Sequence, residues 1–445
     1  MADYSAHFLV WGRDLNKHAS DYLSGLLGTE RRKNMERIHG DIPESNYQGI
    51  QQFITDSPWK EAELMAQVAR EVNGLLGGHR HSALILDETS FVKKGESSVG
   101  VQRQYCGRLG KTENCQMGVF ACLGLGERAS IVDFRLFLPE SWAGDPERCQ
   151  KAGVPEPHRV HRSKQMLALE MVEAARARGL DFTWVLGDAA YGSSLDFGRE
   201  VAALGYYYLL DAAGTTRVWT EDPRPAPLAP SETRARSNSR CRPSNAKAQS
   251  GKLEALVKAR FAGEARELTI RQTTKGPLRA KVLILSVWLW EEGAPAAERR
   301  TVVAREYEDG KIKISWTNAP EGTSANELAY MQAQRHWVER NFEDAKSELG
   351  MAEYEVRKWR GWHHHMALVS LAMLFLLKER VAHAETAPLL SARDIVELLA
   401  FYLPRRGGTE QEVLDDLVRR HRQRKRASIS HAKIKSKPPV ETVTK

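Results

Sequence analysis

The first part of the chain carries apolar residues at helical spacing. They recur between Leu23 and Leu27, and again every three or four positions from Glu61 to Leu76. Ser57-Pro58-Trp59 precedes the second repeat and resembles a helix start, with proline near the first turn. The pattern predicts a helical domain over residues 1–76. A DNA-binding domain and a purely structural helical cap both fit this pattern.

From Ser82 onward the period changes, and residues 77–211 combine short apolar runs with helical repeats. Their order is strand, strand, strand, helix, strand, helix, strand, which predicts an α/β fold with a mixed sheet flanked by helices. The predicted strands are Ser82–Leu86, Cys115–Leu125, Ala129–Leu138, Phe182–Leu186 and Tyr206–Leu210, and the predicted helices are Ser163–Arg178 and Ser193–Leu204.

Residues 212–321 have a different character. A stretch rich in Pro, Ser and Arg, from Pro223 to Ser250, predicts a loop. Four runs typical of antiparallel strands follow it: Ala265–Gln272, Lys281–Trp290, Arg299–Glu306 and Lys311–Thr317. We therefore expect a β-rich insertion. A helical pattern resumes in residues 322–385, and residues 386–445 are predicted to form a helical, basic C-terminal region.

Composition adds a positive charge to this picture. The 445 residues are 42% hydrophobic and 27% charged, as in soluble globular proteins, with a formal net charge of +8 that suits a polyanionic partner. Between Arg405 and Lys437 eleven Lys/Arg face four acids. This run is either a solvated, disordered end or an arm that contacts phosphates.

The cysteines and the apolar runs bear on location. The five cysteines are scattered without a CxxC pair, which argues against a disulfide scaffold and a zinc ribbon. We expect them to be reduced and buried. The N-terminus lacks the pattern of a signal peptide, and the longest apolar stretch, Met366–Leu377, is too short to span a membrane. A cytoplasmic protein is expected.

Two acids directly follow predicted strands. Leu86 precedes Asp87, and Gly187 precedes Asp188. The end of a buried strand is a rigid mount for a ligand, although an Asp there can also simply cap a turn. We exclude Glu88, because adjacent side chains on a strand point to opposite faces. Weaker rivals are Asp181, Asp196 and Asp211.

The third candidate acid lies on a helix predicted from Leu328 to Leu349. At about 100° per residue, Arg335, Glu339 and Lys346 share one face, which also includes Glu343. Such a face can hold a metal through an acid and phosphates through the bases, or it can be a salt-bridged surface.

Three separated carboxylates of this kind suit phosphodiester cleavage with two divalent ions, Mg²⁺ or Mn²⁺. The residues alone leave Glu339 and Glu343 as alternatives. His363-His364-His365 makes a poor chelate, because adjacent helical residues diverge. Trp359 and Trp362 lie among basic residues and fit either nucleic-acid binding or packing.

The order of these motifs resembles bacterial insertion-sequence transposases of the DDE class, in the IS-four-type group and most similar to its IS-seven-oh-one subgroup. The resemblance covers roughly residues 50–380. It rests on Ser57-Pro58-Trp59, Leu86–Ser90 with Lys93-Lys94-Gly95, Gly187–Gly192, and Trp337–Lys346 running into Trp359–His364.

The resemblance implies an RNase H-like core in which Asp87, Asp188 and Glu339 bind the metal ions. The helix motif of the group is Tyr, two residues, Arg, three residues, Glu, six residues, Lys. Arg335, Glu339 and Lys346 match its last three positions, which favours Glu339 over Glu343, whereas Gln332 occupies the Tyr position. That departure puts the role of the Tyr in doubt.

As a member of this group, the protein would be a transposase that binds terminal inverted repeats as a homodimer and cuts and joins double-stranded DNA, associated with the nucleoid when bound. The residues expected to contact DNA phosphates are Arg335, Lys346, Lys93, Lys94 and Arg360. Two alternatives remain: another RNase H-like nuclease, and a domesticated DNA-binding protein without catalysis. The second is disfavoured by the presence of all three acids.

Overall fold

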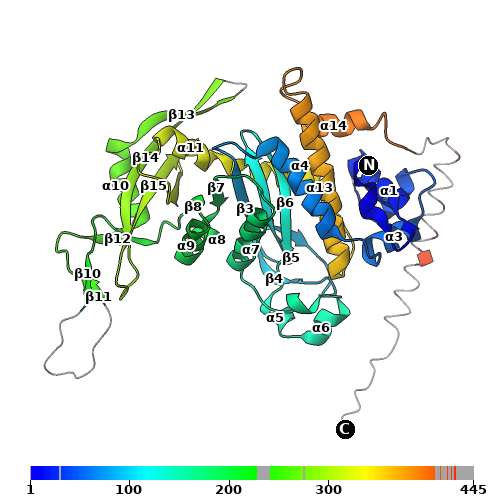
Figure 1. Cartoon of the computed structure of the whole chain (residues 1–445), viewed down its shortest axis with the longest axis horizontal. Coiled ribbons are helices and arrows are strands. Elements are labelled where there is room, and N and C mark those ends of the chain that lie inside the picture. The colour runs from blue at the N-terminus through cyan, green and yellow to red at the C-terminus, as the bar shows by residue number, and fades with distance from the viewer. Residues whose placement is uncertain are drawn as a thin grey trace, which may run out of the picture.

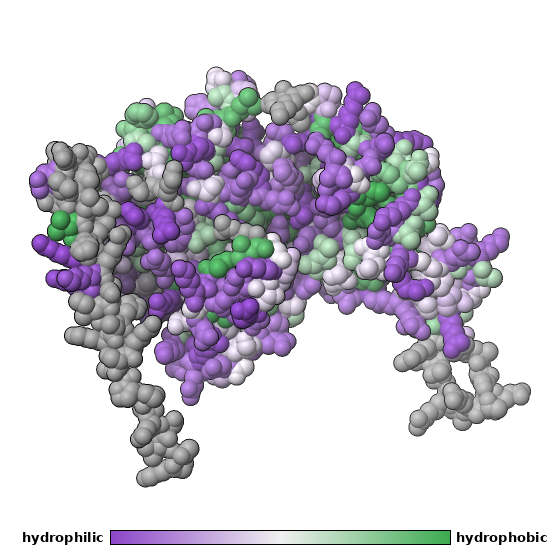
Figure 2. All heavy atoms as spheres, turned by 180° about the vertical axis from the view of Figure 1, so that it is seen from behind, coloured by the Kyte–Doolittle hydropathy of each residue, from purple (hydrophilic) through white to green (hydrophobic). Residues whose placement is uncertain are grey.

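The computed structural model describes residues 2–29, 32–227, 241–273 and 276–405, together with residues 411, 418, 422, 425 and 426. Among these residues a twelve-stranded mixed sheet runs through the molecule, with helices packed against it (Figure 1). The predicted coarse class, a mixed sheet flanked by helices, is confirmed. Seen from behind, the surface is mostly hydrophilic with separate apolar patches (Figure 2).

The N-terminal part is helical, as predicted. The helices bury apolar side chains, among them Leu26, Ile50 and Val68. A 3₁₀ turn and a small hairpin come first and were not predicted. The elements are η1 (Ala2–Phe8), β1 (Leu9–Val10), β2 (Arg13–Asp14), α1 (Asn16–Leu27), α2 (Met35–Asp41), α3 (Tyr47–Thr55) and α4 (Glu61–Leu76).

The central five strands have the spatial order β6-β5-β3-β7-β8. β3, β7 and β8 are parallel, while β5 runs antiparallel to β3 and β6. The predicted strands and helices of this part are confirmed as β3 (Ala83–Val92), β5 (Lys111–Leu125), β6 (Arg128–Leu136), α7 (Lys164–Ala177), β7 (Trp184–Gly187), α9 (Leu195–Ala203) and β8 (Tyr207–Asp211). The elements that were not predicted are β4 (Gln102–Cys106), η2 (Gly107–Leu109), α5 (Glu140–Ala143), α6 (Pro146–Lys151), η3 (Glu156–His158) and α8 (Ala189–Gly192).

The sequence led us to expect that the strand before Asp87 ends there, and this expectation was wrong, because β3 continues past Asp87. β3 pairs with β5 as far as Val92, whereas its pairing with the shorter β7 stops at Leu86 opposite Gly187. A strand that is paired on one side can continue through a polar residue. Asp87 is therefore the first residue of β3 whose β7-side edge is unpaired, and the site opens there.

The β-rich segment predicted for residues 212–321 continues the central sheet. β16 pairs antiparallel with β8, so that Ser315 lies opposite Asp211. The four predicted strands are confirmed as β13 (Arg266–Thr273), β14 (Gly276–Leu289), β15 (Glu298–Glu306) and β16 (Ile312–Thr317). Within the predicted loop, residues 228–240 lie outside the described residues. The unpredicted elements are β9 (Arg217–Trp219), β10 (Pro225–Pro227), β11 (Cys241–Pro243), β12 (Ser250–Lys252) and α10 (Leu253–Glu264).

The helix expected over Leu328–Leu349 is two helices, α11 (Ala325–Gln334) and α12 (His336–Ser347). Arg335 forms the joint; its backbone stays helical, but Val338 N–H bonds its carbonyl at 3.2 Å, a tighter 3₁₀-type contact. Interruption of the regular i to i+4 ladder is a common cause of such a break.

The long helix α13 (Trp359–Ala382) packs against α4 and β6 and is buried over most of its length. α14 (Ala392–Leu399) follows it, and the basic run between Arg405 and Lys437 lies largely outside the described residues. All five cysteines are buried and unpaired, as predicted. In the described part of the chain, no helix is both long enough and apolar enough to cross a membrane.

Gly192 at the end of α8 provides a test of how tightly this helix meets β8. A Cβ at Gly192 would lie 1.9 Å from the carbonyl oxygen of Asp211. We expect Gly192→Ala to lower the free energy of unfolding by about 3 kcal/mol or more, because backbone must move. Gly263→Ala in α10 is the control, since its Cβ meets open space. Urea unfolding measures both, and equal stabilities would contradict the packing.

Candidate active site

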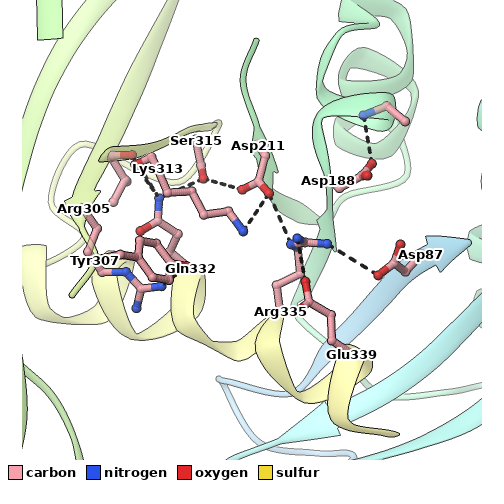
Figure 3. Close-up of polar contacts among 12 residues, drawn as sticks. Asp87, Asp188, Asp211, Arg305, Tyr307, Lys313, Ser315, Gln332, Arg335 and Glu339 are labelled. Atoms are coloured by element: carbon pink, nitrogen blue, oxygen red, sulfur yellow. Dashed lines mark hydrogen bonds and ion pairs between the residues drawn. The ribbon is translucent and has the colours of Figure 1, made fainter. Parts of the chain in front are cut away.

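Asp87 and Asp188 meet where β7 ends. Asp87 lies on β3, and its Oδ1 accepts the backbone N–H of Glu88 at 2.8 Å. Asp188 caps α8, and its Oδ1 accepts the N–H of Ala190 at 2.8 Å. Figure 3 shows both carboxylates with Arg335 and Glu339 beside them. The apolar runs of β3 and β7 anchor these two acids in the buried sheet.

Glu88, which the alternation of side chains along the strand led us to exclude, lies close to these two acids. One oxygen each of Asp87, Glu88 and Asp188 lies within 4.8 Å of the other two. Glu88 is held by Lys164 Nζ at 2.6 Å and by the hydroxyl of Tyr191 at 3.3 Å. Alternation along β3 does send it to the face covered by α7. Because the edge of β3 is unpaired there, its carboxylate still approaches Asp87.

Burial and mutual repulsion set the electrostatics of the cluster. The pKa of Asp87 is raised from 3.8 to about 7, chiefly because the carboxyl is buried; Arg335 opposes this rise, and the charges of Asp188 and Glu88 add to it. The pKa of Asp188 is also raised, first by burial and then by Glu88. Both groups therefore resist carrying their negative charge without a nearby cation.

The donor set fits a divalent metal ion. Three carboxylates offer hard oxygen atoms, which Mg²⁺ and Mn²⁺ prefer. Their repulsion is the kind that a bound cation offsets. Asp87, Glu88 and Asp188 could therefore hold a divalent ion together. Among the described residues, Glu339 belongs to no such group of three acids.

Glu339 is connected to the cluster through Arg335. Arg335 Nη2 lies 2.9 Å from Glu339 Oε1, and Nη1 lies 3.5 Å from Asp87 Oδ2. The side chain of Glu339 is 53% exposed, whereas that of Arg335 is 16% exposed. The guanidinium thus lies between the acid on α12 and the acid on β3.

The predicted face of α12 does turn toward β3. Lys346 Nζ donates to the hydroxyl of Thr89, two residues beyond Asp87 on the same side of the strand. Glu343 instead pairs with Arg340 at 3.0 Å and is 65% exposed. Arg335 and Lys346 thus contact the strand that bears Asp87, while Glu343 points to solvent.

Asp211, a weaker rival in the sequence, is a further acid at the same sheet edge. It ends β8, is 7% exposed, and its Oδ2 lies 3.2 Å from Arg335 Nε and 2.9 Å from Lys313 Nζ. The signal was present in the sequence: Leu210-Asp211 repeats the pattern of an apolar strand running into Asp.

The other predicted phosphate contacts, Lys93, Lys94 and Arg360, have different surroundings. Lys93 Nζ lies 3.4 Å above the ring of Tyr354, and burial lowers its pKa to about 7. Lys94 is exposed. Arg360 is exposed and donates to the carbonyl of Asp56 at 2.9 Å. Their roles toward DNA stay predictions.

The aromatic and histidine candidates on α13 are packing residues. Trp359 and Trp362 are buried, as are all three histidines from His363 to His365. His363 bonds the carbonyl of Trp359 at 2.9 Å, and burial lowers its pKa to about 3. The neighbouring rings bond other carbonyls, His364 those of Ile54 and Trp59 and His365 that of Met351.

Two comparisons with known proteins identify the family of the chain. A family model described as "DDE superfamily endonuclease" matches residues 12–277, more than half of the chain. That match includes Asp87 and Asp188 and ends before Glu339. The chain is also 31% identical over 173 residues to the "Probable transposase for insertion sequence element IS701" of Microchaete diplosiphon. This stretch spans 38% of the chain and 41% of that relative.

The pKa of Asp87 predicts a pH-dependent stability of the metal-free protein. A carboxyl whose pKa is raised by folding stabilises the folded state fully at pH values below its pKa in the unfolded chain, near 3.8. This stabilisation is lost as the pH rises through the pKa in the folded state, about 7. Asp87→Asn never ionises. At pH 8 in EDTA we expect the unfolding free energy of Asp87→Asn to exceed that of wild type by roughly 2–4 kcal/mol. This difference should shrink toward pH 4. Urea unfolding at both values tests this; a pH-independent difference would contradict it.

The position of Glu88 predicts a contribution to metal binding. Glu88→Gln should weaken binding of Mn²⁺ by roughly 10-fold or more, because an amide replaces a carboxylate of the cluster. Titration calorimetry of the full chain with Mn²⁺ measures this. Glu343→Gln serves as the matched control, because Glu343 pairs with Arg340 on the exposed side of α12. Equal affinities of the two variants would remove Glu88 from the site.

Proposed function

The chain belongs to the DDE superfamily of endonucleases, and from this premise we propose that it is a DNA transposase with an RNase H-like catalytic core. The observation that carries the proposal is the meeting of Asp87 and Asp188 at the open edge of β3, with Arg335 of the α11–α12 joint and Glu339 of α12 beside them. The strand order β6-β5-β3-β7-β8 supports the proposed core. In it β5 is antiparallel to both β6 and β3, and β3, β7 and β8 are parallel.

The proposed metal ligands are Asp87, Asp188 and Glu339, which would hold two Mg²⁺ or Mn²⁺ ions, and the position of Glu88 in the acidic cluster makes it a further candidate. When bound, such ions activate the attacking oxygen and stabilise the leaving oxygen of a phosphodiester. Asp87 lies on β3, and Asp188 lies at the start of α8, directly after β7. Glu339 has to exchange its contact with Arg335 for the cluster, and its exposed position on α12 leaves room for this change.

The proposed substrate is double-stranded DNA, namely the terminal inverted repeats of a mobile element and its target. The net charge of +8 supports a polyanionic partner. Arg335 and Lys346 would approach phosphates near the scissile bond, and Lys93, Lys94 and Arg360 would contact DNA farther away. Joining two element ends requires two active sites, so a homodimer on DNA is part of the proposal.

Cleavage of a labelled duplex that carries the flanking inverted repeat tests this function. With Mg²⁺, wild type should cut at the element end, and Asp87→Ala, Asp188→Ala and Glu339→Ala should bind but cut at least about 100-fold more slowly, because each loses a carboxylate ligand. Glu343→Ala is the control. If Glu343→Ala fails and Glu339→Ala cuts, the third ligand is misassigned. If every protein binds the repeat and none cuts, a non-catalytic DNA-binding function replaces the proposal.

A further inference from the structure

Asp211 is held from several directions. Its Oδ1 accepts the hydroxyl of Ser315 at 2.8 Å, and Lys313 lies 2.9 Å from its Oδ2 (Figure 3). Both partners come from β16, which pairs with β8 so that Ser315 is directly opposite Asp211. Ser315 in turn accepts the side-chain amide of Gln332 at 2.9 Å. Asp211 is thus fixed by the insertion strand and, through Ser315, by α11.

The same carboxylate fixes Arg335. Three nitrogens of this guanidinium contact three different acids: Nε lies 3.2 Å from Asp211, Nη1 lies 3.5 Å from Asp87, and Nη2 lies 2.9 Å from Glu339. A guanidinium is a rigid planar fork, so anchoring one edge sets the direction of the other two nitrogens. Nη2 donates a hydrogen bond to Glu339, whereas Nε makes none among the described residues, so Asp211 acts on the direction of Arg335 through the contact of their charges.

Asp211 differs in kind from the acids of the metal-binding cluster. Both of its oxygens are already engaged, one by a hydroxyl and one by two cations. Among the described residues it is not part of the group formed by Asp87, Glu88 and Asp188. Its surroundings suit a permanent anion that anchors a cation, rather than a ligand that exchanges partners.

We propose that Asp211 is a positioning residue for DNA cleavage, which acts by orienting Arg335 between Asp87 and Glu339. The inference rests on the proposed function for the reaction that it supports, and it assigns a role to a residue outside the predicted triad. It also makes β16 part of the catalytic apparatus, because Ser315 and Lys313 hold Asp211 in place.

The matched control is Asp133 on β6. This acid is also buried, at 4% exposure, and also pairs with two cations, Arg135 and Arg178. Asp211→Asn and Asp133→Asn therefore remove equivalent charges from the same sheet. With full-length protein, Mg²⁺ and the inverted-repeat duplex, Asp211→Asn should cut roughly 10- to 100-fold more slowly with unchanged DNA affinity. Asp133→Asn should cut at nearly the wild-type rate.

A double-mutant comparison separates positioning from general loss of structure. If Asp211 acts through Arg335, then Asp211→Asn should add no further loss to Arg335→Gln, whereas independent effects would multiply. Wild-type cleavage by Asp211→Asn, multiplying effects, or an equal loss in Asp133→Asn would each overturn the inference. Should Asp211→Asn fail to fold, Ser315→Ala removes one hydrogen bond to Asp211. It should then slow cleavage about 5-fold, and an unchanged rate would overturn the inference.

A spectroscopic readout tests the link without DNA cleavage. In protein labelled with ¹⁵N-arginine, the Nε–H signal of Arg335 is identified by its loss in Arg335→Lys. It should shift or broaden in Asp211→Asn and stay unchanged in Asp133→Asn. An unchanged signal in Asp211→Asn overturns the inference whatever the cleavage data show. A wild-type protein that cuts no duplex overturns the proposed function instead, and the signal then decides the link between Asp211 and Arg335.

Discussion

The constraint on which the site depends is the repulsion among acids that are crowded at one edge of a sheet. Ionised carboxylates are costly to bury unless cations or hydrogen bonds accompany them. Here Lys164 accompanies Glu88, Lys313 accompanies Asp211, and Arg335 reaches Asp87 and Asp211 together. These cations come from α7, β16 and the α11–α12 joint, so the acids come together only when elements distant in the sequence have assembled around them.

The unequal lengths of β3 and β7 create the space for that crowding. β5 supports β3 on one side as far as Val92, while β7 leaves its other side unpaired from Asp87 onward. Side chains from both faces of β3 can then converge at one edge, and α8 brings Asp188 to the same place. A β7 that continued beside β3 would separate Asp87 from Glu88 by the sheet itself.

Features with a local cause could be predicted from the sequence, and features with a non-local cause could not. The apolar run before Asp87 and the repeat of α12 specify a strand and a helix face by themselves. The continuation of β3 past Asp87 depends on β5, and the entry of Glu88 into the site depends on where β7 stops. Likewise, no local pattern reveals that β16 pairs with β8 and brings Lys313 to Asp211.

The departure from the family helix motif belongs to this non-local support. Gln332, which stands where the motif has Tyr, is buried, and its amide donates to the carbonyl of Val303 at 3.1 Å and to the hydroxyl of Ser315 at 2.9 Å. A tyrosine hydroxyl has one proton to donate and could not serve both acceptors. Because Ser315 also bonds Asp211, Gln332 is the first member of a polar chain that ends at Arg335. The substituted position and the anchored arginine are therefore two ends of one network, which ties the helix of Glu339 to the insertion strands.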